Sequence, residues 1–120
     1  MKTINQNSSY SEEYSENSFI GQLHEQNIWD DTEYFKLEDA LYILCAENEN
    51  NKSIPRDVAW PIMRIFSYIM LALGSHIDPN DDFEMQNINH DQFYSRRERQ
   101  LLVFEGFFKG KMPNREHLGY

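Results

Sequence analysis

Hydrophobic side chains recur every three or four positions in three segments of the chain, the spacing that gathers them on one face of an α-helix. No segment alternates between apolar and polar residues in the way that strands joined by hairpins do. The pattern therefore predicts an all-α fold with three main helices. Their apolar stripes are Tyr34, Leu37, Leu41 and Leu44 in the first, Ile62, Ile65, Phe66, Ile69 and Leu73 in the second, and Phe93, Arg97, Leu101 and Phe104 in the third.

Local signals bound these helices. The acidic run 30–33 can cap the first helix, and the run 89–91 can cap the third, which spans about residues 92–107. Gly74 is predicted to end the second helix as a left-handed cap. Pro61 does not suit a helix interior, so this helix either kinks there or begins anew at Trp60. Because residues 55–73 are apolar nearly all round, we expect them at the centre of a bundle.

The front of the chain is different. Residues 1–17 are polar and show no period, and they are predicted to form a flexible or loosely docked arm, part of which Tyr10 and Tyr14 could pin to the core. A short helix follows, with its start capped by Ser18 or Asn17 and with apolar side chains between Phe19 and Leu23. The expected architecture is one helical domain over residues 18–120, a small bundle of three main helices and one or two minor ones.

The charge is concentrated in the same front part. Over its 120 residues the chain has a formal net charge of −9. Residues 1–50 carry 11 acidic and 2 basic side chains, whereas residues 87–120 carry 4 acidic and 6 basic ones. Such a field repels nucleic acid and anionic membranes and attracts basic proteins, although many proteins are acidic merely for solubility. We expect a protein partner, and no contact with nucleic acid or membrane.

No residue pattern favours catalysis. The single cysteine, Cys45, excludes an internal disulfide, and its acidic neighbours disfavour a reactive thiolate. Phosphate-binding glycine loops and nucleophile motifs are absent from the sequence. The four histidines stand singly, without metal-ligand spacing, at His24, His76, His90 and His117. The sequence indicates a non-enzyme without cofactor or metal. The rival, an enzyme with His24 or His90 as general base, lacks a positioned partner residue.

One loop resembles part of a calcium site. Asp78, Asn80 and Asp82 have the spacing that begins an EF-hand loop. Phe83 stands where the turn needs glycine, and Asn89 stands where the metal needs a bidentate glutamate. A solvated turn is the favoured interpretation.

Neither a leader nor a membrane span is expected. The first residues lack the apolar stretch of a signal peptide. The longest apolar run, residues 68–73, is far shorter than the roughly 18 residues that cross a bilayer. The sequence predicts a cytoplasmic protein and leaves its oligomeric state open.

The basic cluster of the chain is Arg96, Arg97 and Arg99. On a helix the first and third are neighbours, while Arg97 points elsewhere. We expect ion pairs with the acidic front half rather than phosphate contacts. Since Arg97 falls in the apolar stripe, it is the predicted partner of a buried carboxylate.

Carboxylates beside an aromatic residue form the predicted partner-binding site. Charges of this kind steer encounter, and aromatic side chains anchor interfaces. Trp29 is either such an exposed anchor or a buried residue beside a helix cap, and the sequence does not decide between these. The candidate partner-binding residues are Glu12, Glu13, Glu16, Trp29, Asp30, Asp31, Glu33, Glu47 and Glu49.

The stretches Ser18-Phe19-Ile20-Gly21, Ile28-Trp29-Asp30-Asp31 and Glu33-Tyr34-Phe35-Lys36-Leu37-Glu38-Asp39-Ala40-Leu41 carry a family resemblance. The chain is similar here to small bacterial immunity proteins encoded beside polymorphic toxins, including those of contact-dependent growth inhibition. The resemblance covers about residues 18–42 and implies a protein that binds one cognate toxin domain, often a nuclease, and blocks it in the cytosol.

A second hypothesis is an acidic DNA mimic or regulatory adaptor that inhibits a host DNA-binding protein. It requires carboxylates spaced along a surface like phosphates, whereas here they cluster near one end of the chain. Capture of a host protein would favour the adaptor, and capture of the toxin would favour the immunity protein.

Overall fold

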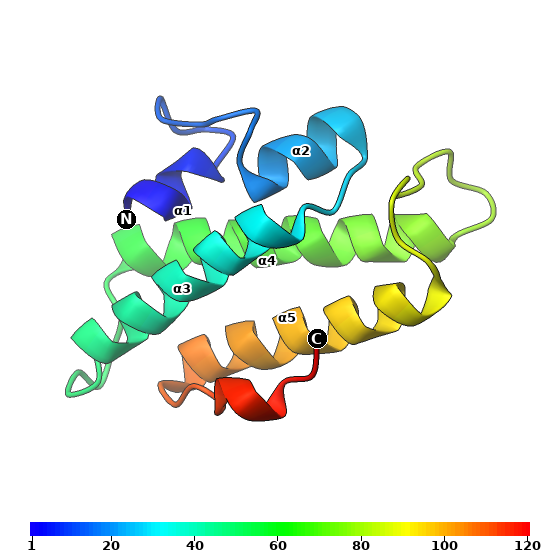
Figure 1. Cartoon of the computed structure of the whole chain (residues 1–120). Helices are drawn as coiled ribbons and strands as arrows, with labels where there is room; N and C mark the ends of the chain where they lie inside the picture. The colour runs from blue at the N-terminus through cyan, green and yellow to red at the C-terminus, as the bar shows by residue number, and fades with distance from the viewer.

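In the computed structural model, which describes residues 1–120, every regular element is helical (Figure 1). The all-α prediction is confirmed: three long helices match the three segments of helical period, two short helices precede them, and a short 3₁₀ turn follows. The elements are α1 (Lys2–Gln6), α2 (Phe19–Gln26), α3 (Asp31–Glu47), α4 (Arg56–Ile77), α5 (His90–Lys109) and the 3₁₀ turn η1 (Arg115–His117).

The other helices all pack against α3 and α4. Helices α1 and α2 lie on one side of this pair, and α5 lies on the other, so that each of the three contacts both (Figure 1). The core between them is rich in aromatic side chains, with Phe19, Trp29 and Tyr34 in mutual ring contact at centroid distances of 4.8–5.6 Å. Burial of one such side chain contributes about 1.5–3 kcal/mol, which makes this cluster a main source of stability.

The predicted helix starts are confirmed atom by atom. Ser18 Oγ accepts the Gly21 N–H at 3.0 Å, and Asp30 Oδ1 accepts the Glu33 N–H at 3.0 Å. Asn89 and Gln92 form a reciprocal capping box with two bonds of 2.9 Å. Each cap satisfies backbone donors that a helix start leaves free.

The segment predicted to be a flexible arm is packed on the helices. Residues 2–6 form α1, and the side chain of Ile4 is completely buried between α3 and α4. The amide side chain of Asn7 accepts the Ile20 N–H at 2.9 Å, and the Ser15 N–H is donated to the Gln6 carbonyl at 2.9 Å. A single apolar residue and a few buried polar bonds thus hold a segment whose composition is polar.

Helix α4 does not begin anew at Trp60, so that alternative for Pro61 is wrong. It is one helix from Arg56 onward, and Pro61 lies inside it with its ring buried. The predicted end at Gly74 is wrong, because the helix continues to Ile77. The last turn is held by His76, which stacks on Phe93 at 5.2 Å and accepts the Met85 N–H at 3.0 Å. These tertiary contacts outweigh the local preference of glycine for a cap.

Candidate partner-binding surface

A carboxylate at the centre of the molecule holds three helical segments together. Glu38 of α3 is completely buried. Arg99 of α5 donates to both of its oxygens, at 2.9 and 2.8 Å, and Arg115 of η1 donates to Oε2 at 2.8 Å. The Tyr34 hydroxyl donates to Oε1 at 3.2 Å. All lone pairs of the buried charge are therefore engaged.

These partners govern the ionisation of the cluster. Burial by itself raises the pKa of Glu38, but hydrogen bonds and charges from Arg99 and Arg115 outweigh it, and the pKa lies below its ordinary value. Burial and the neighbouring Glu38 charge raise the pKa of Tyr34 far above its ordinary value. The tyrosine thus stays a hydrogen-bond donor, and the carboxylate stays charged at neutral pH.

The arginines of α5 bind the acidic front half, as predicted, but through other residues than expected. Arg96 forms a bidentate pair with Asp31, and Arg99 pairs with Glu38. Arg97, the predicted buried partner, is half-buried and lies over the Tyr94 ring at 4.8 Å. The buried face of α5 therefore differs from the predicted one. Leu101, which shared the predicted stripe with Arg97, is exposed. Arg96 and Arg99 are buried instead, because an arginine that is paired with a carboxylate can enter the core.

Contacts within the fold engage every candidate residue around Trp29. Trp29 is buried, with 1% of its surface exposed, so the alternative of an exposed anchor is wrong. Asp30 caps α3, and Asp31 pairs with Arg96. Glu33 accepts a bond of 2.8 Å from Lys36. This corner is occupied by contacts within the fold.

The other five candidate residues are exposed and take part in no ion pair: Glu12, Glu13, Glu16, Glu47 and Glu49. They fall into two groups at different edges of the molecule. The first lies on the loop 7–18 between α1 and α2, and the second lies at the far end of α3 (Figure 1). From Glu33 to Glu47 the helix alone rises about 21 Å, so the nine predicted residues do not form one patch.

A feature that sequence reasoning missed lies on the outer side of α4. Its buried stripe is Pro61, Ile62, Ile65, Ile69, Ala72 and Leu73. The opposite side is also apolar: Trp60, Met63, Met70 and Leu71 are exposed, with Leu71 65% accessible. The sequence signal was present, because residues 55–73 are apolar all round, but it was interpreted as a central helix. In a protein this small, such a helix also borders solvent.

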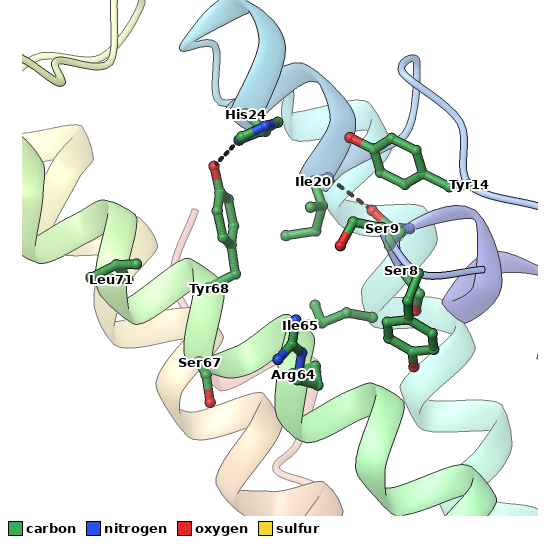
Figure 2. Close-up of a pocket in the computed structure, with 12 residues that line it drawn as sticks. Ser8, Ser9, Tyr14, Ile20, His24, Arg64, Ile65, Ser67, Tyr68 and Leu71 are labelled. Atoms are coloured by element: carbon green, nitrogen blue, oxygen red, sulfur yellow. Dashed lines mark hydrogen bonds between the residues drawn. The ribbon is translucent and has the colours of Figure 1, made fainter.

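A groove runs beside this surface, between α4 and the segment formed by the loop 7–18 and α2 (Figure 2). Its volume is about 310 Å³. Ile20 of α2 and Ile65 of α4 lie in the middle of the groove. Tyr68 and His24 lie at one end of it, and Tyr14 and Ser9 lie at the other. His24 Nδ1 and the Tyr68 hydroxyl are 2.9 Å apart, which ties α2 to α4 at the rim. The groove is apolar at its base and polar around its mouth.

Helix α4 is long and apolar enough, by length and composition, to cross a membrane. Core helices of soluble proteins share these properties, and the buried stripe of α4 packs on three other helices. No group of three or more His, Cys, Asp or Glu side chains is arranged to hold a metal ion. In the loop 78–89, Asp78 and Asp81 accept the N–H groups of Asn80 and Phe83, both at 2.9 Å.

Comparison with known proteins gives one match. The family model described as Immunity protein 41 matches residues 6–100, well over half of the chain. No curated protein matches the chain, and no solved structure matches it. The matched range includes the loop 7–18, α2, α3, α4 and about half of α5, which build the groove and hold every member of the buried Glu38 cluster except Arg115.

Proposed function

The chain belongs to the immunity protein 41 family, and from this premise we propose that it binds one cognate bacterial toxin domain and neutralises it without catalysing a reaction. Family membership is the observation that carries the proposal. The structure adds a rigid helical scaffold whose exposed carboxylates and apolar α4 surface are not used by the fold itself.

We propose further that the toxin is a nuclease and that the complex forms in the cytosol, as a defence against a toxin delivered by a neighbouring cell. A nuclease needs a basic surface to hold a polyanion, and a chain with net charge −9 attracts such a surface. The two groups of unpaired carboxylates, on the loop 7–18 and at the end of α3, supply the charge that steers the encounter.

Protection of cells tests the function directly. A strain that expresses the cognate toxin domain, encoded beside this protein, is expected to survive only when the protein is co-expressed. With purified components, one equivalent of protein is expected to stop cleavage of nucleic acid by the toxin. Survival without co-expression, or a complex formed with a host DNA-binding protein and not with the toxin, would overturn the proposal.

The steering mechanism has its own test. The association rate with the toxin domain should fall steeply between low and high salt, while the dissociation rate changes little. In a triple variant, Glu12→Gln, Glu13→Gln and Glu16→Gln, we expect a roughly three- to tenfold slower association at low salt.

A matched control removes three exposed, unpaired carboxylates elsewhere: Glu84→Gln, Glu98→Gln and Glu105→Gln. It changes the net charge equally and should slow association less. Equal effects of the two triple variants would show that only total charge matters. An association rate indifferent to salt would refute steering, though not the immunity function.

A further inference from the structure

The exposed side of α4 is an unusual surface for a protein that acts alone. Between residues 58 and 77 the only permanently charged side chain is that of Arg64, and its guanidinium carbon lies 5.8 Å from the centre of the Trp60 ring. Trp60, Met63 and Leu71 stay exposed on this side. Tryptophan, methionine and arginine are enriched in the cores of protein interfaces, where charged residues are depleted. The composition fits an interface centre.

The neighbouring groove continues this surface inward. Leu71 and Arg64 of α4 line it, and Tyr10, which also lines it, packs on the Trp60 ring at 4.5 Å. A volume of about 310 Å³ lies at the lower end of the range for ligand pockets, about 300–1,000 Å³. That space admits one large side chain with part of its neighbours. The exposed apolar surface and the groove therefore form one continuous recess and rim.

Contacts within the fold form the groove before any partner arrives. At Gly21 an added Cβ would lie 2.3 Å from the Ser15 carbonyl oxygen, which shows how closely the loop 7–18 rests on α2. The Ile20 N–H donates to Asn7 and holds the loop 7–18 against α2. The contact of His24 with Tyr68 connects α2 to α4. A preformed site avoids the entropic cost of ordering loops on binding.

Two carboxylates, Glu16 and Glu25, lie near the mouth of the groove. Burial is the main cause that raises the pKa of Tyr14, and the charges of Glu25 and Glu16 raise it further. Burial is likewise the main cause that raises the pKa of Tyr68, across the groove, and the Glu25 charge raises it further. Glu16 and Glu25 are both exposed. Glu12 and Glu13 lie on the loop 7–18, as Glu16 does. The only cation that lines the groove is Arg64.

We propose that the groove and the outer side of α4 form the docking surface for the toxin, which inserts one large apolar side chain flanked by lysine or arginine. The apolar base, Ile20 and Ile65, accepts the inserted side chain, and the acidic rim contacts the flanking cations. This inference rests on the proposed function and specifies its site: the carboxylates of the loop 7–18 act at this surface, and those at the far end of α3 do not contact the toxin.

Two exposed positions test the docking surface. Leu71→Asp places a charge at its centre, and Trp60→Ala removes its largest side chain. We expect each to weaken binding of the purified toxin domain at least tenfold, mainly through faster dissociation, as measured by surface plasmon resonance. The matched control is Ile43→Asp, which places the same charge at a similarly exposed position within the length of α3. It should bind like wild type.

Unfolding midpoints of all three variants establish that the fold is intact, and sedimentation of the free protein shows whether it self-associates. Wild-type affinity in Leu71→Asp and Trp60→Ala would overturn this inference, as would a dimer that both substitutions dissociate without a change in toxin binding. A wild-type protein that does not bind the toxin at all would instead overturn the proposed function. The two failures are therefore distinct.

Discussion

Glu38 shows how one residue can be essential to this fold without facing a partner. It is removed from water, yet two guanidinium groups and a hydroxyl saturate its oxygens. A buried pair of this kind adds little beyond what an apolar replacement would give, but loss of one member leaves the others charged and unpaired. The cluster also connects α3 to η1, and through it to the end of the chain.

We expect Glu38→Gln to lower the free energy of unfolding by about 3–5 kcal/mol, because Arg99 and Arg115 would lose their shared counter-charge. Asp39→Asn is the matched control, since Asp39 also contacts Arg115 but is exposed. Its loss should cost less than about 1 kcal/mol. Urea unfolding followed by circular dichroism measures both, and equal losses would contradict the special role of Glu38.

The difference in stability between wild type and Glu38→Gln should depend on pH, with a defined sign. The pKa of Glu38 is held below its ordinary value of 4.5, so its contribution to stability is complete above that pH and is lost as the pH falls through the folded pKa. The stability difference between wild type and Glu38→Gln should be constant near neutrality and shrink below pH 4.5. A difference that did not change with pH would refute this.

At the scale of elements, two glycines in helices have opposite roles. Gly21, in the first turn of α2, lies under the backbone of Ser15 and Glu16, so that the loop 7–18 can rest on the helix. Gly74, inside α4, has no atom within 4 Å of the position that a Cβ would take. The first glycine is required by packing, whereas the second only weakens its helix.

Gly21→Ala should destabilise the protein by about 1–3 kcal/mol, because the methyl group would push the loop away from α2. Gly74→Ala should stabilise it by about 0.5–1 kcal/mol, the helix preference of alanine over glycine. Thermal unfolding of the two variants measures both signs. A loss of stability in Gly74→Ala would mean that α4 ends at this residue, as the sequence alone suggested.

At the scale of the whole molecule, folding brings the acidic front and the basic end of the chain together. Asp31 and Glu38 of the front half are neutralised by three arginines from residues 87–120. Of the front-half carboxylates, those on the loop 7–18 and at the end of α3 are exposed and take part in no ion pair. Their charge can steer a basic partner toward these two edges.

The front segment is a structural part of this whole. Ile4→Ala should cost about 2–5 kcal/mol in the free energy of unfolding, because Ile4 is completely buried between α3 and α4. Ile43→Ala, at an exposed isoleucine, should change it by less than about 0.5 kcal/mol. Denaturant unfolding compares the two. If Ile4→Ala were as mild as its control, residues 1–17 would behave as the mobile arm that their composition predicts.

The sequence by itself determined the helical class, the three long helices, the helix starts near Ser18, Asp30 and Asn89, and the pairing of α5 arginines with front-half acids. These features are local or compositional: a cap needs only residues within one turn, and helical period is visible along the chain. The exposure of the candidate acidic residues could be predicted only in part, because it depends on whether another residue of the fold is already paired with them.

Tertiary structure decided everything that depends on residues distant in sequence. It buried Trp29 and Glu38, chose Arg96 and Arg99 over Arg97, and carried α4 past Gly74. It also left the second apolar side of α4 in solvent, since α1, α2 and α5 cover only one. Helical period tells which residues share a face, but the neighbour that each face meets follows from packing across the whole chain.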